Sequence, residues 1–103
     1  MKPVIIVSTY PNKKFLIDFS NELLENKIIA CVNFSKISSI YLWKNSINNA
    51  SEFLAIFKTT IKHKEQLKRR IEETHPYDVP EITEIDILSI NNSYLKWLVN
   101  STN

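Results

Sequence analysis

The stretch IIACVNFSKISSIYLWKN, residues 28–45, decides the fold, because it predicts one long extended segment in a chain of 103 residues. Its apolar side chains alternate along the segment, but their phase changes midway. The two sets are Ala30, Val32 and Phe34, followed by Ile37, Tyr41 and Trp43. A bulge or bend near residues 35–36 would bring both sets to the same face of a sheet.

The residues that follow predict a hairpin. KNSINNAS, residues 44–51, has the composition of a turn, and SEFLAIFKTT, residues 51–60, predicts the returning strand. The apolar residues of this strand occupy both parities; they are Phe53, Leu54, Ala55, Ile56 and Phe57. We therefore expect the hairpin to be apolar on both of its faces.

The flanking segments complete an alternating order of strands and helices. We expect a strand over residues 2–9, a helix between Asn12 and Asn26, a helix over 61–74 capped by Thr59 or Thr60, a strand over 81–90 and a short helix over 91–100. This order predicts an α+β fold of the ferredoxin-like, split β-α-β type, with an antiparallel sheet and both main helices on one face. Residues 1–103 form a single domain in this interpretation.

Helices on one face of such a sheet leave its other face uncovered. Because the second and third strands are apolar on both sides, that face would expose a large apolar patch, which soluble monomers avoid. A symmetric oligomer is the simplest way to cover it. We expect Tyr41 and Trp43, on the long hairpin, to lie at the interface between subunits.

Bulk composition excludes several classes of function. The net charge of +2 is too weak to indicate nucleic acid or an anionic membrane as a partner. No segment is long and apolar enough for a signal-peptide core or a membrane span, and the single cysteine fits a reducing compartment, so we expect a cytoplasmic protein. The chain has no glycine, which excludes the usual phosphate-binding loops and nucleophile elbows. Asparagine is the expected residue wherever the backbone needs a positive φ.

The densest stretch of functional side chains is THPYDVPEI, residues 74–82. Its two prolines end a helix and fix the entry to the next strand, so the stretch is first a stiff corner. The alternative interpretation is that the corner holds His75, Tyr77 and Glu81 at the rim of a cleft between subunits.

A metal site within one subunit is not predicted by spacing. Zinc and copper need two to four converging ligands, and the chain has only His63, His75 and Cys31 beside its carboxylates. At roughly 1.5 Å per residue along a helix, the two histidines lie more than about 15 Å apart. A weak site that combines His75 with carboxylates such as Glu81, some from a neighbouring subunit, stays open.

Several motifs together resemble the CutA family, the divalent-cation tolerance proteins. They are ACVN (30–33), SSIYLWKN (38–45), FKTT (57–60), HPYDVPEI (75–82) and YLKWL (94–98). The resemblance covers nearly the whole chain. It implies a ferredoxin-like subunit, a cyclic homotrimer and a link to copper and other divalent cations.

The chain departs from the family pattern at three positions. Asn45 stands where many members have a glycine after the tryptophan of the hairpin. Ser8 stands where some bacterial members have a cysteine implicated in copper binding, and Thr74 stands where they have a second histidine. The resemblance therefore implies weaker copper binding, with His75 as its anchor and loss of affinity as the pH falls through about 6.

Two classes of function remain open. The first is a homotrimer that serves cation tolerance by binding copper or another divalent cation weakly. The second is a trimeric sensor or scaffold, similar to the PII signalling proteins in architecture, that binds a small ligand or a partner protein between subunits. An enzyme is not expected, because nothing in the sequence places a histidine beside Cys31. An RNA-binding surface is not expected either, because Phe53 and Phe57 are equally explained as core.

Overall fold

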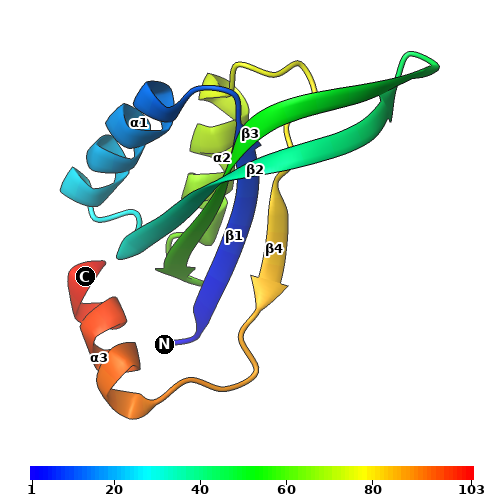
Figure 1. Ribbon diagram of the computed structural model, residues 1–103. Helices are drawn as coiled ribbons and strands as arrows, with labels where there is room; N and C mark the ends of the chain where they lie inside the picture. The colour runs from blue at the N-terminus through cyan, green and yellow to red at the C-terminus, as the bar shows by residue number, and fades with distance from the viewer.

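Four strands pair in the order β2-β3-β1-β4 in a computed structural model that describes residues 1–103, and each strand runs antiparallel to its neighbours (Figure 1). The elements are β1 (Pro3–Tyr10), α1 (Lys13–Glu25), β2 (Cys31–Trp43), β3 (Ser46–Thr60), α2 (Lys64–Thr74), β4 (Thr83–Asp86) and α3 (Asn92–Ser101). This order and pairing confirm the predicted α+β, ferredoxin-like arrangement.

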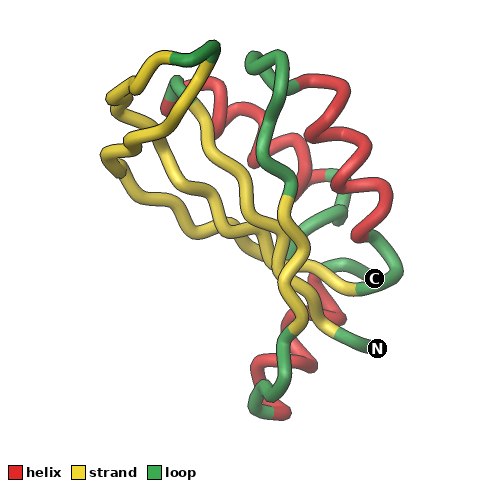
Figure 2. The backbone as a smooth tube through the Cα atoms, turned by 90° about the vertical axis from the view of Figure 1, so that its right-hand side faces the viewer, coloured by secondary structure: helices red, strands yellow, loops and turns green.

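The core lies between one face of the sheet and the helices α1 and α2, which Figure 2 shows on the same side of the strands. Alternate residues of β1 point into this core, since Val4, Ile6 and Tyr10 are fully buried. The helices contribute an apolar stripe each; the buried members are Leu16, Phe19, Leu23, Leu67 and Ile71. Helix α1 begins as predicted, with the Asn12 side chain accepting the Phe15 N–H at 3.0 Å.

The predicted bulge near residues 35–36 is wrong. Strands β2 and β3 pair without interruption from Cys31 opposite Lys58 to Trp43 opposite Ser46. The change of phase in the sequence is therefore real: the two sets of apolar residues lie on opposite faces of the strand. Val32 packs against the core, whereas Ile37 belongs to the face away from the helices.

The hairpin turn is much shorter than predicted. Only Lys44 and Asn45 form it, with φ of 50° and 65°, and residues 46–51 already belong to β3. Positive φ at both central residues is the signature of a type I′ turn, whose twist matches that of the flanking strands. Strand β4 is likewise shorter than the predicted 81–90, and α2 begins at Lys64 after His63, because Thr59 and Thr60 are buried within β3.

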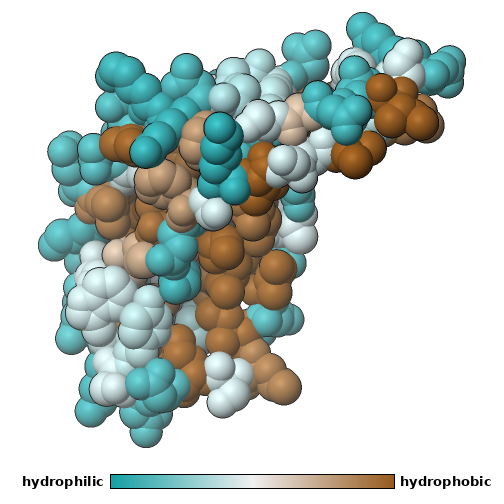
Figure 3. Space-filling model, in the orientation of Figure 1, coloured by the Kyte–Doolittle hydropathy of each residue, from teal (hydrophilic) through white to brown (hydrophobic).

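The face of the sheet opposite the helices is apolar over much of its area. Its side chains come from β1, β3 and β4 and include Ile5, Val7, Leu54, Ile56 and Ile85. We call these five residues the open face. Figure 3 shows hydrophobic side chains gathered over the sheet and again towards the end of the hairpin, which projects beyond the rest of the chain in Figure 1.

Positive φ in this glycine-free chain falls on two lysines and one asparagine. Besides the hairpin residues, Lys27 has φ of 58°, so the expectation that asparagine fills such positions holds at Asn45 alone. Lys27 follows the C-cap of α1. The Lys27 N–H donates to the Leu24 carbonyl at 3.1 Å, and the Ile28 N–H donates to the Leu23 carbonyl at 2.9 Å. This pair of bonds is the Schellman motif, which favours glycine at the position of Lys27.

The Lys27→Gly variant should therefore be more stable than the wild type. A non-glycine residue in the left-handed region destabilises the folded state by about 1 kcal/mol or more. Glycine removes this strain, but it also makes the unfolded chain more flexible, which offsets part of the gain. We therefore expect the free energy of unfolding to rise by about 0.5–1 kcal/mol. Urea denaturation at a fixed protein concentration measures it. Lys27→Ala removes the same charge without relieving the backbone, and an equal gain in that variant would contradict this explanation.

Candidate functional site

The corner between α2 and β4 begins at His75. Helix α2 ends at Thr74, and His75 turns to an extended conformation with φ of −65° and ψ of 136° while its N–H still bonds the Ile71 carbonyl. Pro76 cannot continue the helix and restricts the residue before it to this extended region. The sequence prediction of a rigid corner is confirmed in this local geometry.

The imidazole ring of His75 joins this corner to the end of β1. Its Nε2 lies 2.8 Å from the Thr9 carbonyl oxygen, and its Nδ1 accepts the Tyr77 N–H at 3.1 Å. Because Nδ1 is an acceptor, Nε2 carries the proton and the ring is the neutral tautomer. The ring also stacks on Tyr10, with centroids 4.3 Å apart. Burial lowers the pKa of His75 below its ordinary value, although the Thr9 bond opposes the shift.

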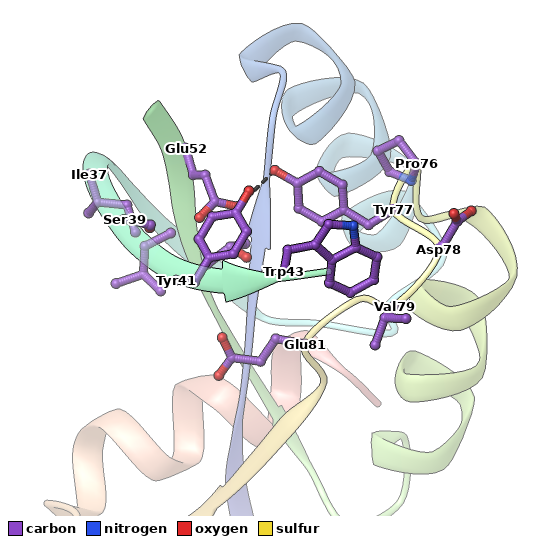
Figure 4. Close-up of a pocket in the computed structure, with 12 residues that line it drawn as sticks. Ile37, Ser39, Tyr41, Trp43, Glu52, Pro76, Tyr77, Asp78, Val79 and Glu81 are labelled. Carbon is purple, nitrogen blue, oxygen red and sulfur yellow. Dashed lines mark hydrogen bonds between the residues drawn. The ribbon is translucent and has the colours of Figure 1, made fainter. Parts of the chain in front are cut away.

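The Tyr77 side chain extends the corner to β3. Its hydroxyl donates to Glu52 Oε2 at 2.7 Å, the hydrogen bond that is dashed in Figure 4. Burial, followed by this bond to a carboxylate, raises the pKa of Tyr77 far above its ordinary value, so the phenol stays protonated. Glu52 lies opposite Ile37 in the β2–β3 register and is only 7% exposed. Tyr77 therefore joins the corner to a buried carboxylate on β3.

A cavity of about 680 Å³ opens between the hairpin and the corner. Its walls come from β2, β3, the end of β1 and the segment 76–81 (Figure 4). The lining side chains that can contact a ligand through charge or an aromatic face are Tyr41, Trp43, Glu52, Tyr77, Asp78 and Glu81. Ile37, Leu54 and Val79 add apolar surface. Apolar walls with a few polar groups are typical of small-molecule sites.

The structure brings together four of the five residues that sequence analysis singled out. Tyr41, Trp43, Tyr77 and Glu81 line the cavity, while His75 lies outside it and is tied to Thr9. Their roles stay predictions. Sequence analysis missed Glu52, although the alternation in SEFLAIF already places this acid on the same side of the strand as the apolar residues Leu54 and Ile56.

The side chains of this chain do not fit a divalent cation. No group of three or more His, Cys, Asp or Glu side chains converges on a common point. Both nitrogens of His75 are engaged, His63 Nε2 lies 2.5 Å from the Thr102 carbonyl, and Glu81 accepts from the Thr83 hydroxyl at 2.8 Å. A metal ion on His75 would have to displace one of the bonds that hold the corner.

Comparisons with known proteins agree over almost the whole chain. The family model described as CutA1 divalent ion tolerance protein matches residues 4–101. A divalent-cation tolerance protein CutA from Pyrococcus horikoshii is 39% identical over 99 residues, which are 96% of this chain and 97% of that protein. The protein of the same name from Thermotoga maritima is 35% identical over 95% of this chain and 97% of its own length.

Solved structures show the same fold. The divalent ion tolerance protein CutA1 from Ehrlichia chaffeensis superimposes with a TM-score of 0.94 at 37% identity, over 100% of this chain and 98% of that one. A protein from Archaeoglobus fulgidus described as periplasmic divalent cation tolerance protein CutA gives 0.93 at 29% identity, over 98% and 99%. None of the helices in the present chain is long and apolar enough to cross a membrane.

The depressed pKa of His75 predicts a pH dependence of stability. The unfolded chain takes up a proton near the ordinary pKa of about 6.5, whereas the folded chain takes it up only at lower pH. The free energy of unfolding should therefore fall as the pH drops from 7.5 through 6.5 towards 5. His75→Gln keeps a donor and an acceptor but does not titrate, so denaturation across this range should show a flatter profile.

His63→Gln is the control for this measurement. It removes the other histidine and leaves the Thr9–His75–Tyr77 contacts in place. If His63→Gln flattened the profile and His75→Gln did not, the assignment of the pH dependence to the corner would be wrong.

Proposed function

The chain belongs to the CutA1 divalent ion tolerance family, and we propose that it acts as a homotrimer that serves cation tolerance as a binding protein, not as an enzyme. The observation that carries the oligomer is the open face, which no element of the same chain covers over most of its area. Ile85 there is 46% exposed.

The end of the hairpin supplies a second apolar surface. Ile40, Leu42 and Ile47 are 74%, 69% and 76% exposed, and they lie beyond the part of the sheet that the helices cover (Figure 1). We call these three residues the hairpin patch. Two different apolar surfaces on one chain favour a head-to-tail contact, in which the hairpin patch of one copy covers the open face of the next. Three copies joined in this way close into a ring, which is the trimer that the resemblance to the family implies.

Divalent cations enter this proposal through the family, since the relatives are named for tolerance of them. Because the side chains of one subunit do not fit a metal ion, we propose that tolerance does not depend on a high-affinity site within a subunit. The neutral His75 is better explained as the clamp between α2 and β1.

The non-enzymatic assignment rests on where the candidate groups lie. The thiol of Cys31 faces Asn33 Oδ1 at 3.8 Å, while the ring nitrogens of His63 and His75 bond backbone groups elsewhere. No thiol–imidazole pair is formed. The free thiol of Cys31 fits a reducing compartment and so favours a cytoplasmic location. One similar structure is described as periplasmic, so this location stays a prediction.

The cavity at the hairpin base favours the second candidate function, a sensor or scaffold that binds a small ligand. Its walls combine apolar surface with the carboxylate of Glu52 and the phenol of Tyr77. Leu54 lines this cavity and also belongs to the open face, so in the proposed trimer the cavity would lie at an interface between subunits.

Sedimentation equilibrium should give a mass three times the 12.1 kDa of the chain at micromolar concentration. Ile47→Asp places a charge in the hairpin patch, and because an unpaired charge is costly to bury, its mass should fall towards that of one chain. Gln66→Glu, on the exposed side of α2, adds the same charge away from the hairpin and should keep the wild-type mass. A folded wild-type monomer would contradict the proposed assembly.

Copper titration tests the metal part. We expect the wild type and His75→Ala to bind Cu²⁺ with affinities within about twofold at pH 7.5, because ligation by His75 must break a bond that holds the corner. His75→Ala should instead lower the thermal midpoint. Tight binding by the wild type that is lost in His75→Ala and at pH 5.5, but kept in His63→Ala, would establish His75 as a ligand.

A further inference from the structure

Glu52 is a buried carboxylate whose charge has no cationic partner in the chain. It is 7% exposed, and the only side chain that bonds it is the neutral Tyr77 hydroxyl, at Oε2. The six ion pairs of the protein all involve other residues. Buried charges in proteins are normally paired, because removing a carboxylate from water costs several kcal/mol. Glu52 therefore presents its remaining acceptor, Oε1, for a cation from outside the subunit.

Aromatic rings surround the space that this carboxylate faces. Tyr41 and Trp43 from β2 and Tyr77 from the corner line the same cavity as Glu52 (Figure 4). The negative faces of such rings attract cations, most strongly when water is excluded. Trp43 already lies near one cation, because Lys44 Nζ is 6.0 Å from the ring centroid. Asp78 and Glu81 add negative charge among the lining residues, and no lysine or arginine is among them.

This combination suits an organic cation better than a metal ion. Copper, zinc and magnesium need several oxygen, nitrogen or sulfur ligands at short range, and no such group converges here. An alkylated ammonium is weakly hydrated and needs only aromatic faces and one or two carboxylates. The volume of about 680 Å³ lies within the usual range for small-molecule sites, roughly 300–1,000 Å³.

We propose that this cavity binds a small organic cation of the alkylated ammonium class, with Glu52 as its counter-charge and the three aromatic rings as its walls. The inference goes beyond the proposed function, because it requires neither a divalent metal nor a particular number of subunits. The Tyr77 hydroxyl acts as a positioning group, since its bond to Oε2 holds the carboxylate towards the cavity.

Calorimetric titration of the full chain with choline chloride tests the proposal against a neutral compound of the same shape, 3,3-dimethylbutan-1-ol. We expect choline to bind and the alcohol to bind at least about tenfold more weakly, because it lacks the charge. The indole N–H signals in NMR spectra assign the site. The Trp43 signal should move with choline, and the Trp97 signal, from α3, should not. Equal binding of the two compounds, or an unmoved Trp43 signal, would overturn the proposal.

Two variants test whether the charge of Glu52 is needed for choline binding. Glu52→Gln keeps an acceptor for the Tyr77 hydroxyl but removes the charge, so choline should bind at least about tenfold more weakly. Glu73→Gln removes an exposed carboxylate on α2 that lies outside the cavity, and it should bind choline as the wild type does. If choline failed to bind and Glu52→Gln lowered the mass of the assembly, the cation would be a basic side chain of a second copy, and the small-molecule proposal would be wrong.

Discussion

The whole structure depends on one constraint: the sheet is apolar on both faces, but the helices α1 and α2 cover only one of them. Helices α1 and α2 bury the even-numbered residues of β1, such as Ile6 and Tyr10, while Ile5 and Val7 on the other face remain partly open to water. The hairpin then runs beyond the area that the helices cover, and it carries apolar residues on both sides there. A surface of this kind is stable in water only when another surface covers it.

The corner after α2 is held by contacts to residues far away in the sequence. One histidine ring bonds Thr9, 66 residues away in the sequence, and stacks on Tyr10. The next aromatic residue, Tyr77, bonds Glu52 on the neighbouring strand β3. Because the corner contributes only the neutral His75 and Tyr77 side chains to these contacts, it supplies no positive charge, and the Glu52 carboxylate stays uncompensated within the chain.

How far the sequence predicts this protein depends on the range of the interactions involved. The start of α1 was predictable, since Asn12 caps the helix through a contact only three residues away. The turn was predicted too long because NNAS has turn composition, yet pairing with β2 draws residues 46–51 into a strand. The prediction of a bulge failed because it assumed that the hairpin has one core-facing side, whereas β2 continues past the core.

The candidate site was predictable only in part, for the same reason. Tyr41, Trp43 and Tyr77 stand out in the sequence as aromatic residues beside turns and prolines, so they could be singled out before their positions were known. No feature of the neighbouring sequence indicates that both ring nitrogens of His75 bond backbone groups or that the Tyr77 hydroxyl bonds Glu52. Those facts depend on the pairing of β1 with β3 and on where the corner crosses the sheet.

The placement of the cavity links ligand binding to assembly. Tyr41 and Trp43 belong to the hairpin that the proposed trimer uses for contact, and Tyr77 and Glu52 belong to the body of the same subunit. A neighbour that fixes the hairpin relative to the body would also fix the distance between the aromatic walls and the carboxylate. By linkage, a cation that binds better to the fixed geometry must strengthen the contact between subunits to the same degree. The apolar surface that forces association and the charge that favours a cation would then act on one movable element, the β2–β3 hairpin.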